Sequence, residues 1–446
     1  MVARAPGSGL WIGLCCVTMF GLGACATKQS ADAARDVAAD LDDTPIDAPP
    51  SDVPIDAPLP DVPDAPVDLR DATAERTEAS GDAPDAAGPD GPAPDGPGGK
   101  CTIVHLAPVQ EPVDTILADV DGDGHLDIVT AEQIGSISVY RGDGHRSFAA
   151  GENYATTSSI MASHYLNSVA AGDVDGDGKV DLVGNTIYGV VGLLLTGSGS
   201  GFVATQLAAA QSDTSNHVAV ADLDGDGHLD IAQPTYSHGN VGIWWGTGGG
   251  AFLPRVTAPG CTYPIHLTVI DANEDRHPDL VVGCYGGSSR VLINDGSRGF
   301  SATGTFAAGG IYRAPAAGDL NGDGHVDLAF ADFFFKEVQV YLGDGTGKFS
   351  APTGLLQKPP AMSPYATAMG DFDGDGRVDV VVGDPSLKQL YFYSGTGDGH
   401  LQSPKVLSLP MAGNNVAAAD IDGDGIDDLV SDDWDSGIDV LFGPCP

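Results

Sequence analysis

Short apolar runs alternate with polar, glycine-rich turns from residue 101 to residue 446. A run of small residues such as Val218-Ala219-Val220-Ala221 leads into an aspartate-rich loop, and a branched apolar run such as Leu280-Val281-Val282 leaves one. An alternating segment follows, for instance Val338-Gln339-Val340-Tyr341-Leu342, and then a glycine-rich turn. Short runs of this kind, bounded by turn residues, predict β-strands. We therefore expect an all-β fold for this part of the chain.

The pattern repeats about every 50 residues, and the register of the repeat is tight. The aspartate-rich loops begin at Asp119, Asp173, Asp222, Asp271, Asp319, Asp371 and Asp420. In the first six units one large apolar residue lies 29 or 30 positions after that aspartate: Phe148, Phe202, Phe252, Phe300, Phe349 and Leu401. Such register across a glycine-rich hairpin indicates the same four short strands in each unit. Units of this length are typical of propeller blades, so we expect a seven-bladed β-propeller of four-stranded antiparallel blades.

The two ends of the repeat region complement each other. The seventh unit reaches Pro446 just after its third predicted strand, Ile438-Asp439-Val440-Leu441. A further predicted strand, Thr102-Ile103-Val104-His105-Leu106, precedes the first loop and has no unit of its own. We expect this N-terminal strand to complete the last blade and close the ring, which removes two open sheet edges.

Four cysteines in the repeat region predict disulfides. When the units are aligned, Cys445 falls at the start of the missing hairpin turn and Cys101 at its end, so we predict a Cys101–Cys445 bridge. Cys261 and Cys284 lie near the same end of the fourth unit, and we expect them to form a second bridge. An even number of such cysteines fits an oxidising compartment.

Each loop carries oxygen ligands at alternate positions, as in Asp119-Val120-Asp121-Gly122-Asp123-Gly124-His125-Leu126-Asp127. Positions 1, 3, 5 and 9 offer carboxylate or amide oxygens and position 7 its backbone carbonyl, a donor set that suits Ca²⁺ better than Mg²⁺. The predicted calcium ligands are Asp119, Asp121, Asp123, His125, Asp127, Asp173, Asp175, Asp177, Lys179, Asp181, Asp222, Asp224, Asp226, His228, Asp230, Asp271, Asn273, Asp275, His277, Asp279, Asp319, Asn321, Asp323, His325, Asp327, Asp371, Asp373, Asp375, Arg377, Asp379, Asp420, Asp422, Asp424, Ile426 and Asp428. We expect up to seven structural Ca²⁺ ions.

Two details refine this expectation. Position 7 is histidine in four loops, but Lys179, Arg377 and Ile426 replace it elsewhere, so we expect only its carbonyl to bind and its side chain to face solvent. The fourth loop has Asn273 in place of an aspartate and Arg276 in place of a glycine. We predict that this loop binds calcium most weakly or not at all.

On these motifs the units resemble the FG-GAP and VCBS repeats, whose blades also form the head of integrin α subunits. The resemblance covers residues 101–446 and implies a calcium-loop β-propeller. The formal charge of −42, from 62 acidic and 20 basic residues, fits bound cations and excludes nucleic acid as a partner.

The N-terminal region has a different composition. An apolar run from Leu10 to Leu22 follows Arg4 and ends in Leu22-Gly23-Ala24-Cys25, which resembles the lipobox of bacterial lipoproteins. The resemblance implies a signal peptide over residues 1–24, a lipid anchor on Cys25 and, because Ala26 follows, transport to the outer membrane or cell surface. An ordinary secretory signal with an incidental cysteine is the alternative. The Asp-, Pro- and Ala-rich residues 25–100 predict a disordered tether.

The loops between the second and third strands should lie on the face opposite the calcium loops. They are rich in aromatic residues, which suit stacking on sugars or anchoring of a protein partner. The candidate ligand-face residues are Tyr188, Tyr236, Tyr285, Phe333, Phe334, Phe335 and Trp434. For each of them, packing between blades is the alternative.

Three functions fit these features. We expect a monomeric, surface-anchored binding or adhesion module for a glycan or a protein ligand, attached to the membrane through its lipid anchor only. The main alternative is an enzyme, either a polysaccharide lyase or a phosphodiesterase-like protein, because both use such propellers. No catalytic motif is found in the sequence, and we predict no catalytic residue. The third possibility is a structural subunit of a surface assembly.

Overall fold

The structure is a computed structural model of the chain. It describes residues 101–107, 111–133, 135–155, 166–186, 193–197, 202–206, 215–286, 288–306, 313–350, 363–409, 413–433 and 437–445. The predicted signal peptide, Cys25, the tether, Tyr188 and Trp434 lie outside these residues. None of the described residues belongs to a helix long and apolar enough to cross a membrane.

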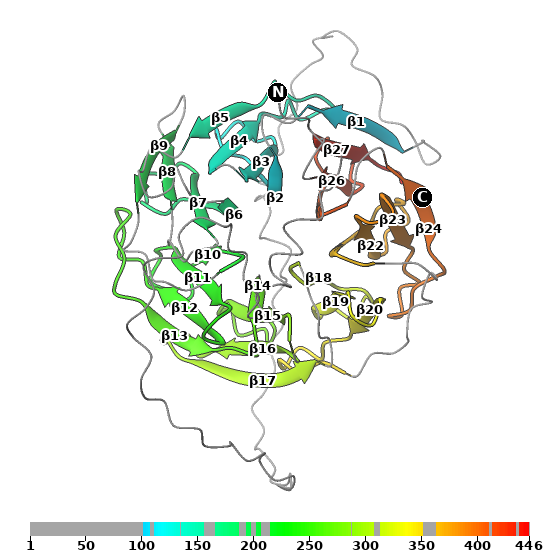
Figure 1. Ribbon diagram of the computed structural model, residues 1–446. Coiled ribbons are helices and arrows are strands. Elements are labelled where there is room, and N and C mark those ends of the chain that lie inside the picture. The colour runs from blue at the N-terminus through cyan, green and yellow to red at the C-terminus, as the bar shows by residue number, and fades with distance from the viewer. Residues whose placement is uncertain are drawn as a thin grey trace, which may run out of the picture. The chain divides into compact units, whose positions relative to one another are not determined.

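The described strands form antiparallel sheets that follow one another around a propeller (Figure 1). The first sheet contains β2 (Pro112–Ala118), β3 (Asp127–Glu132), β4 (Ser136–Tyr140) and β5 (Glu152–Ala155). The second contains β6 (Leu166–Gly172), β7 (Asp181–Thr186), β8 (Leu193–Gly197) and β9 (Phe202–Gln206). The third contains β10 (Ala219–Ala221), β11 (Asp230–Thr235), β12 (Asn240–Trp244) and β13 (Val256–Pro259).

The other sheets repeat this order. The fourth contains β14 (Pro264–Ile270), β15 (Asp279–Cys284), β16 (Ser289–Asn294) and β17 (Phe300–Phe306). The fifth contains β18 (Ala316–Gly318), β19 (Asp327–Asp332) and β20 (Glu337–Tyr341). The sixth contains β21 (Ala366–Gly370), β22 (Asp379–Asp384), β23 (Gln389–Tyr393) and β24 (Lys405–Ser408). The last contains β25 (Asn415–Ala419), β26 (Asp428–Asp433), β27 (Gly437–Phe442) and β1 (Thr102–Leu106).

Six sheets have four strands, rather than the predicted seven, and the fifth sheet has three among the described residues. The hairpin after β20 begins as expected, with a bridge between Gly343 and Phe349. The fourth strand predicted for this unit falls within residues 351–362, which lie outside the described residues. Among the described residues the prediction of seven four-stranded sheets is thus met by six.

The last sheet is built from both ends of the repeat region. Strand β1 pairs antiparallel with β27, with Thr102 opposite Phe442 and Leu106 opposite Ile438. The predicted disulfide between Cys101 and Cys445 is present next to this pairing. The sheet order is β1-β27-β26-β25, so the N-terminal strand occupies the position that the fourth strand has in the other four-stranded sheets.

The hydrophobic core lies between neighbouring sheets. Val129 and Ile137 of the first sheet pack with Leu166 and Leu182 of the second, and all four are fully buried. Each buried aliphatic side chain of this size contributes about 1.5–3 kcal/mol to folding. The middle strand β15 is buried on both faces: Leu280 and Val282 belong to a cluster with residues of the third sheet, and Val281 belongs to one with residues of the fifth.

This topology separates two sets of loops. The aspartate-rich loops join the first and second strands of each sheet, for example β2 and β3. The turns between the second and third strands, for example between β3 and β4, lie at the opposite ends of the same strands because the strands are antiparallel. The aspartate loops and those predicted ligand-face residues that the structure describes are therefore on opposite faces of the propeller.

Candidate metal loops and the opposite aromatic face

The first aspartate of each loop organises the backbone that follows it. In the first loop, Oδ1 of Asp119 accepts a hydrogen bond from the Gly122 N–H at 2.7 Å, and Oδ2 accepts one from Gly124 at 2.8 Å. Both glycines have positive φ values, 78° and 88°. A side chain is strained in this conformation, so glycine at positions 4 and 6 is what lets the chain wrap around the carboxylate.

The last aspartate of each loop is buried and joins the loop to the sheet. Asp127 accepts hydrogen bonds from the Val120 N–H at 3.0 Å and from the Gly142 N–H, at the end of the third strand, at 2.9 Å. Burial raises its pKa to about 6 and raises the pKa of the equivalent Asp428 to about 7, against the opposing effect of these hydrogen bonds. Desolvation thus disfavours the ionised carboxylates, and a nearby cation would stabilise them.

Carboxylate oxygens converge in five of the loops. Three aspartates, at positions 1, 3 and 9, place one oxygen each within 4.8 Å of the others. These groups are Asp119, Asp121 and Asp127; Asp173, Asp175 and Asp181; Asp222, Asp224 and Asp230; Asp371, Asp373 and Asp379; and Asp420, Asp422 and Asp428. Clustered carboxylate oxygens are the ligands that hard divalent cations prefer, so these residues fit a metal ion.

The fourth and fifth loops have asparagine at position 3 and keep the same local geometry. The amide oxygen of Asn321 accepts from the Asp323 N–H at 2.9 Å, as the carboxylate of Asp121 does from Asp123 at 3.3 Å. An amide oxygen is also a ligand for hard cations. These two loops therefore retain the oxygen donors with one negative charge fewer.

The predicted position-5 aspartates lie outside the three-carboxylate groups. Asp123, for example, turns its Oδ1 toward the backbone N–H of His125 at 2.9 Å. The side chain at position 7 is less free than the sequence suggested. A Cβ atom added to the hairpin residue Gly144 would lie 2.0 Å from Nδ1 of His125, so the exposed ring lies against the hairpin glycine.

The fourth loop follows the common backbone path without its glycines. Glu274 and Arg276 have φ values of 61° and 70°, in the region where the other loops have glycine. The Arg276 N–H still donates to Oδ2 of Asp271 at 2.8 Å. Glu274 also contacts Nδ1 of His325 in the next loop, which raises the pKa of that histidine. The loop is thus intact but strained.

Each loop also contacts the neighbouring sheet. The Gly249 N–H of the third sheet's hairpin donates to the Asp175 carbonyl of the second loop at 2.9 Å. Asp427 accepts a hydrogen bond from the Asp371 N–H at 2.8 Å and so joins the seventh loop to the sixth. Sequence spacing gave no sign of these contacts. They place the candidate metal loops at the boundaries between sheets.

On the opposite face, aromatic rings from three neighbouring sheets form a continuous row. We call Tyr236, Tyr263, Tyr285 and Phe334 the aromatic row. The rings of Tyr236 and Tyr263 stack with centroids 4.7 Å apart, Tyr236 and Tyr285 are 6.5 Å apart, and Tyr285 and Phe334 are 5.2 Å apart. The structure therefore brings together several predicted ligand-face residues and adds Tyr263.

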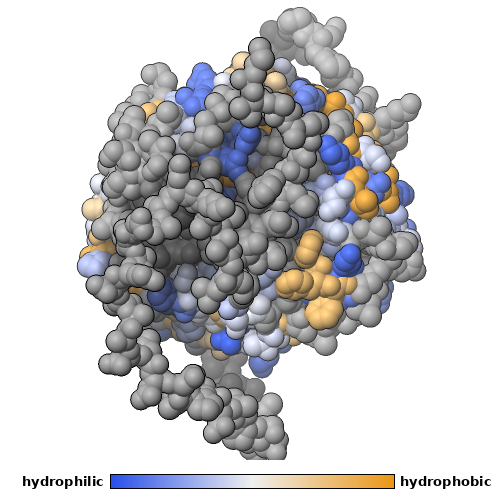
Figure 2. Space-filling model, in the orientation of Figure 1, coloured by the Kyte–Doolittle hydropathy of each residue, from blue (hydrophilic) through white to orange (hydrophobic). Residues whose placement is uncertain are grey.

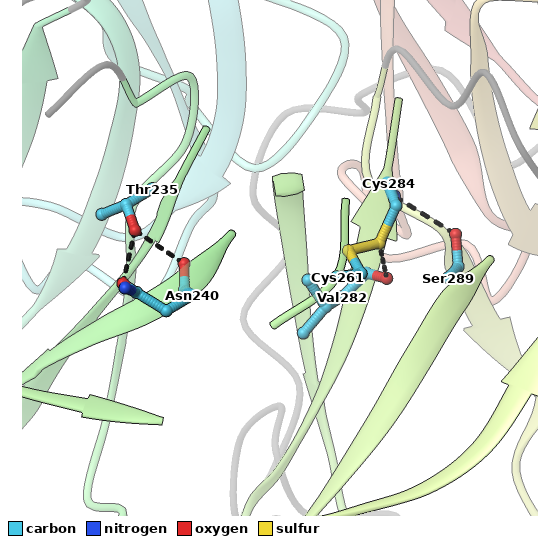
Figure 3. The surroundings of a disulfide bond; sticks show 6 residues. All are labelled: Thr235, Asn240, Cys261, Val282, Cys284 and Ser289. Carbon is cyan, nitrogen blue, oxygen red and sulfur yellow. Dashed lines mark hydrogen bonds between the residues drawn. A yellow bond between two sulfur atoms is a disulfide. The ribbon is translucent and has the colours of Figure 1, made fainter. Parts of the chain in front are cut away.

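A disulfide and a closed turn, shown in Figure 3, lie next to the tyrosines in the sequence and fix the segments that carry them. The predicted disulfide between Cys261 and Cys284 is present, and it joins the segments that carry Tyr263 and Tyr285. The Tyr285 N–H donates to the Tyr263 carbonyl at 2.9 Å. The turn that carries Tyr236 is closed by the Thr235 hydroxyl, which donates to the Asn240 carbonyl at 2.8 Å. The segments that carry the three tyrosines are thus fixed by covalent and hydrogen-bonded contacts.

The exposed end of the row consists of two similar turns on adjacent sheets. In the fifth sheet the Phe335 N–H donates to Asp332 at 2.9 Å, and in the sixth the Leu387 N–H donates to Asp384 at 3.1 Å. Each turn continues into a lysine with φ 55°, Lys336 or Lys388. The exposed fractions are 52% for Phe334, 56% for Phe335 and 40% for Leu387.

Figure 2 shows an apolar patch on this face over the position of β19 and β20, with a hydrophilic residue beside it. Asp384 of the sixth sheet lies within electrostatic range of Lys336 of the fifth, so the two turns are neighbours. An apolar surface of this kind on a rigid element is typical of a binding site.

The repeats match a known family. Residues 119–184, 271–330, 319–382 and 371–431 match the model of the FG-GAP-like repeat, and together they span just over half of the chain. The chain belongs to the FG-GAP-like repeat family. A comparison with curated proteins gave no match.

Solved structures of similar fold are distant in sequence. BBS1N in complex with ARL6DN is 13% identical, with a TM-score of 0.51, over 76% of this chain and 93% of that one. A second crystal of that complex gives 12% identity and a TM-score of 0.50, with the same coverage. A lectin of Agrocybe aegerita that recognises non-reducing terminal N-acetylglucosamine is 20% identical, over 72% of this chain and 85% of that one, with a TM-score of 0.49. These likenesses concern the fold alone.

Proposed function

We propose that this FG-GAP-like propeller is a calcium-stabilised binding or adhesion module that recognises a glycan or a protein ligand. The observation that carries the proposal is the aromatic row with its exposed end at Phe334 and Phe335. Phe334 and Phe335 are consecutive, 52% and 56% exposed, and adjoin a row of rings on segments joined by a disulfide, so they form a patch rather than single exposed residues. Recognition then takes place on the face opposite the aspartate loops.

The aspartate loops have a supporting role in this proposal. Their carboxylate and amide oxygens would hold up to seven Ca²⁺ ions, with the backbone carbonyl of position 7 as a further ligand. Bound cations would neutralise carboxylates whose ionised forms burial disfavours, such as Asp127. Since the loops lie at boundaries between sheets, calcium would stabilise the propeller rather than contact the ligand.

The ends of the chain have their own parts in this proposal. We infer that the pairing of β1 with β27 and the Cys101–Cys445 disulfide close the ring. Two disulfides fit an oxidising, extracellular environment. We further infer that residues 1–24 are a signal peptide, that Cys25 carries a lipid, and that residues 25–100 tether a monomeric propeller to the outer membrane or cell surface.

A protein ligand has a precedent among proteins of this fold, because BBS1N was crystallised in complex with ARL6DN. The aromatic rings fit sugar stacking equally. The alternative function is that of a polysaccharide lyase or a phosphodiesterase-like enzyme. Asp432 and Asp433 are adjacent carboxyl groups, but Asp432 is buried and accepts a hydrogen bond from the Thr115 hydroxyl at 2.7 Å. No observation favours catalysis over binding.

The proposal is tested by screening the full chain against a glycan array and a library of surface and secreted proteins, in calcium. Phe334→Ala and Phe335→Ala should abolish the binding found for the unmodified chain. Val406→Ala is the matched control, because Val406 is 50% exposed on the outer strand β24. Equal binding by all three variants, or turnover of a polysaccharide or phosphodiester, would overturn the proposal.

A further inference from the structure

Two arginines reach from one sheet into the metal loop of its neighbour. Arg298, in the hairpin of the fourth sheet, donates from Nε to Oδ2 of Asp224 in the third loop at 2.5 Å. Its NH2 nitrogen lies 3.5 Å from Oδ2 of Asp226 in the same loop. The guanidinium group therefore contacts the carboxylates of positions 3 and 5 together.

The same arrangement occurs between the last sheet and the first. Arg146, in the hairpin of the first sheet, donates from Nε to Oδ2 of Asp422 at 2.6 Å and from NH2 to Oδ2 of Asp424 at 3.3 Å. These two aspartates also occupy positions 3 and 5 of their loop. Both arginines precede the hairpin phenylalanine by two residues, Phe300 in one case and Phe148 in the other.

A second shared contact fixes each guanidinium group. Arg298 lies over the ring of Trp245 with its carbon 5.2 Å from the centroid, and Arg146 lies over the ring of Phe442 at 5.4 Å. Each ring belongs to the sheet whose metal loop the arginine contacts. Two boundaries between sheets thus have the same three-part contact, in which an arginine, an aromatic ring and a pair of carboxylates meet.

The backbone at Arg298 shows that this position is costly for an arginine. Its φ is 70°, whereas the equivalent hairpin positions of the fifth and sixth sheets are Gly347 and Gly399, with φ values of 76° and 82°. A residue with a side chain is strained in this conformation. The ion pair and the aromatic contact offset that strain at the third-to-fourth boundary.

The charge of the arginine matters most when no cation is bound. Asp222, Asp224 and Asp230 place oxygens within 4.8 Å of one another, and Asp224 is almost fully buried at its side chain. Such carboxylates repel one another across a medium that screens poorly. A guanidinium group that contacts two carboxylates of the loop neutralises part of this charge from the neighbouring sheet.

We propose that Arg146 and Arg298 are built-in counter-ions, which keep the seventh and third loops and the adjoining sheet boundaries intact when the metal is absent. The proposal rests on the proposed metal sites and is independent of the proposed ligand. It has a second consequence, because a fixed positive charge beside a site lowers that site's affinity for Ca²⁺. The arginines therefore stabilise these two loops in the metal-free protein and lower their affinity for Ca²⁺.

The test uses Arg146→Gln and Arg298→Gln in the full chain. Arg255→Gln is the matched control, because Arg255 also lies over a tryptophan, Trp244, at 5.5 Å but donates to the amide of Asn240 rather than to a metal loop. In chelator, each of the two variants should lower the melting temperature by about 2 °C or more relative to the control. In saturating calcium the loss should shrink or vanish.

Calorimetric titration with Ca²⁺ supplies the second readout. Arg298→Gln should raise the affinity of one site about tenfold, and the double variant should do so for two sites. Equal losses of melting temperature with and without calcium would show a packing role only and would overturn the proposal. Unchanged melting in chelator would overturn it as well. If the unmodified chain binds no calcium, the proposed metal sites fail, whereas the melting experiment in chelator still tests the counter-ion role.

Discussion

Arg313 donates from its Nε to the carbonyl oxygen of Asn414 at 3.0 Å, although 101 residues separate them. Its NH2 nitrogen donates to the carbonyl oxygen of Val113 at 2.8 Å. The side chain, only 9% exposed, therefore leaves the segment before β18 and joins the first sheet to the last. It also lowers the pKa of buried Asp432, against a larger effect of burial that raises this pKa.

Arg313→Met should destabilise the propeller by about 3–5 kcal/mol, because two carbonyl acceptors and Asp432 lose their buried cationic partner. Urea unfolding in saturating calcium measures the loss. Arg255→Met, at a partly exposed position, should cost under about 1 kcal/mol. Equal effects of the two substitutions would show that Arg313 does not hold the first and last sheets together.

Glu132 gives the protein a pH-dependent stability. The pKa of this fully buried carboxyl is raised from 4.5 to about 7: burial is the largest cause, hydrogen bonds from Thr130 and Ser138 oppose it, and the charges of Asp432 and Glu111 act in the same direction as burial. Below pH 4.5 the group is protonated in both the folded and the unfolded states. Between pH 4.5 and about 7 the unfolded chain releases the proton first, so the stability from this group is lost as the pH rises.

Glu132→Gln should therefore be more stable than the unmodified chain at pH 8, by up to roughly 3 kcal/mol, and the two should converge near pH 4.5. Denaturant midpoints across this range, in saturating calcium, give the difference. If the stability advantage of Glu132→Gln over the unmodified chain were smaller at pH 8 than at pH 5, the raised pKa of Glu132 would be contradicted.

A glycine at position 6 should make the fourth loop more stable. Arg276→Gly should stabilise the metal-free protein by about 1 kcal/mol, because φ 70° is strained for a residue with a side chain. Arg276→Ala removes the same charge but keeps the Cβ atom, so it should not stabilise the protein. The unmodified fourth loop should also fill last in a calcium titration. Equal stabilisation by Arg276→Gly and Arg276→Ala would show that the charge of Arg276, and not backbone strain, destabilises the loop.

The disulfide between Cys101 and Cys445 should contribute strongly to stability, because it closes a long loop. Replacing both cysteines by serine should cost up to about 6 kcal/mol in the chain-entropy model. Because β1 pairs with β27 beside the bridge, its amide protons should then exchange faster than those of the inner strand β25. Unchanged exchange in β1 would show that strand pairing alone holds this end of the chain.

The repeat itself made the fold predictable. The spacing of the aspartate loops and the hairpin phenylalanines predicted the strand order, and aligning the units placed Cys445 and Cys101 together. In the fifth sheet the structure describes three of the four predicted strands, because the fourth falls within residues 351–362, outside the described residues.

Contacts between units could not be predicted in the same way. Nothing in the spacing indicates that Arg146 reaches Asp422, since 276 residues separate them. The buried role of Asp127 was also missed, because a ligand pattern does not show which carboxylate joins the loop to the third strand. The aromatic face was predicted from residue type, but the ring contacts that join Tyr236, Tyr285 and Phe334 depend on how three sheets pack together, which the sequence does not show.

The central claim is that metal in the aspartate loops holds neighbouring sheets together, while recognition takes place on the other face. Thermal unfolding of the full chain in saturating calcium and in excess chelator tests it most directly. We expect chelation to lower the melting temperature by more than about 10 °C, since several sites bind only the folded state. A melting temperature that is the same in calcium and in chelator would contradict the claim.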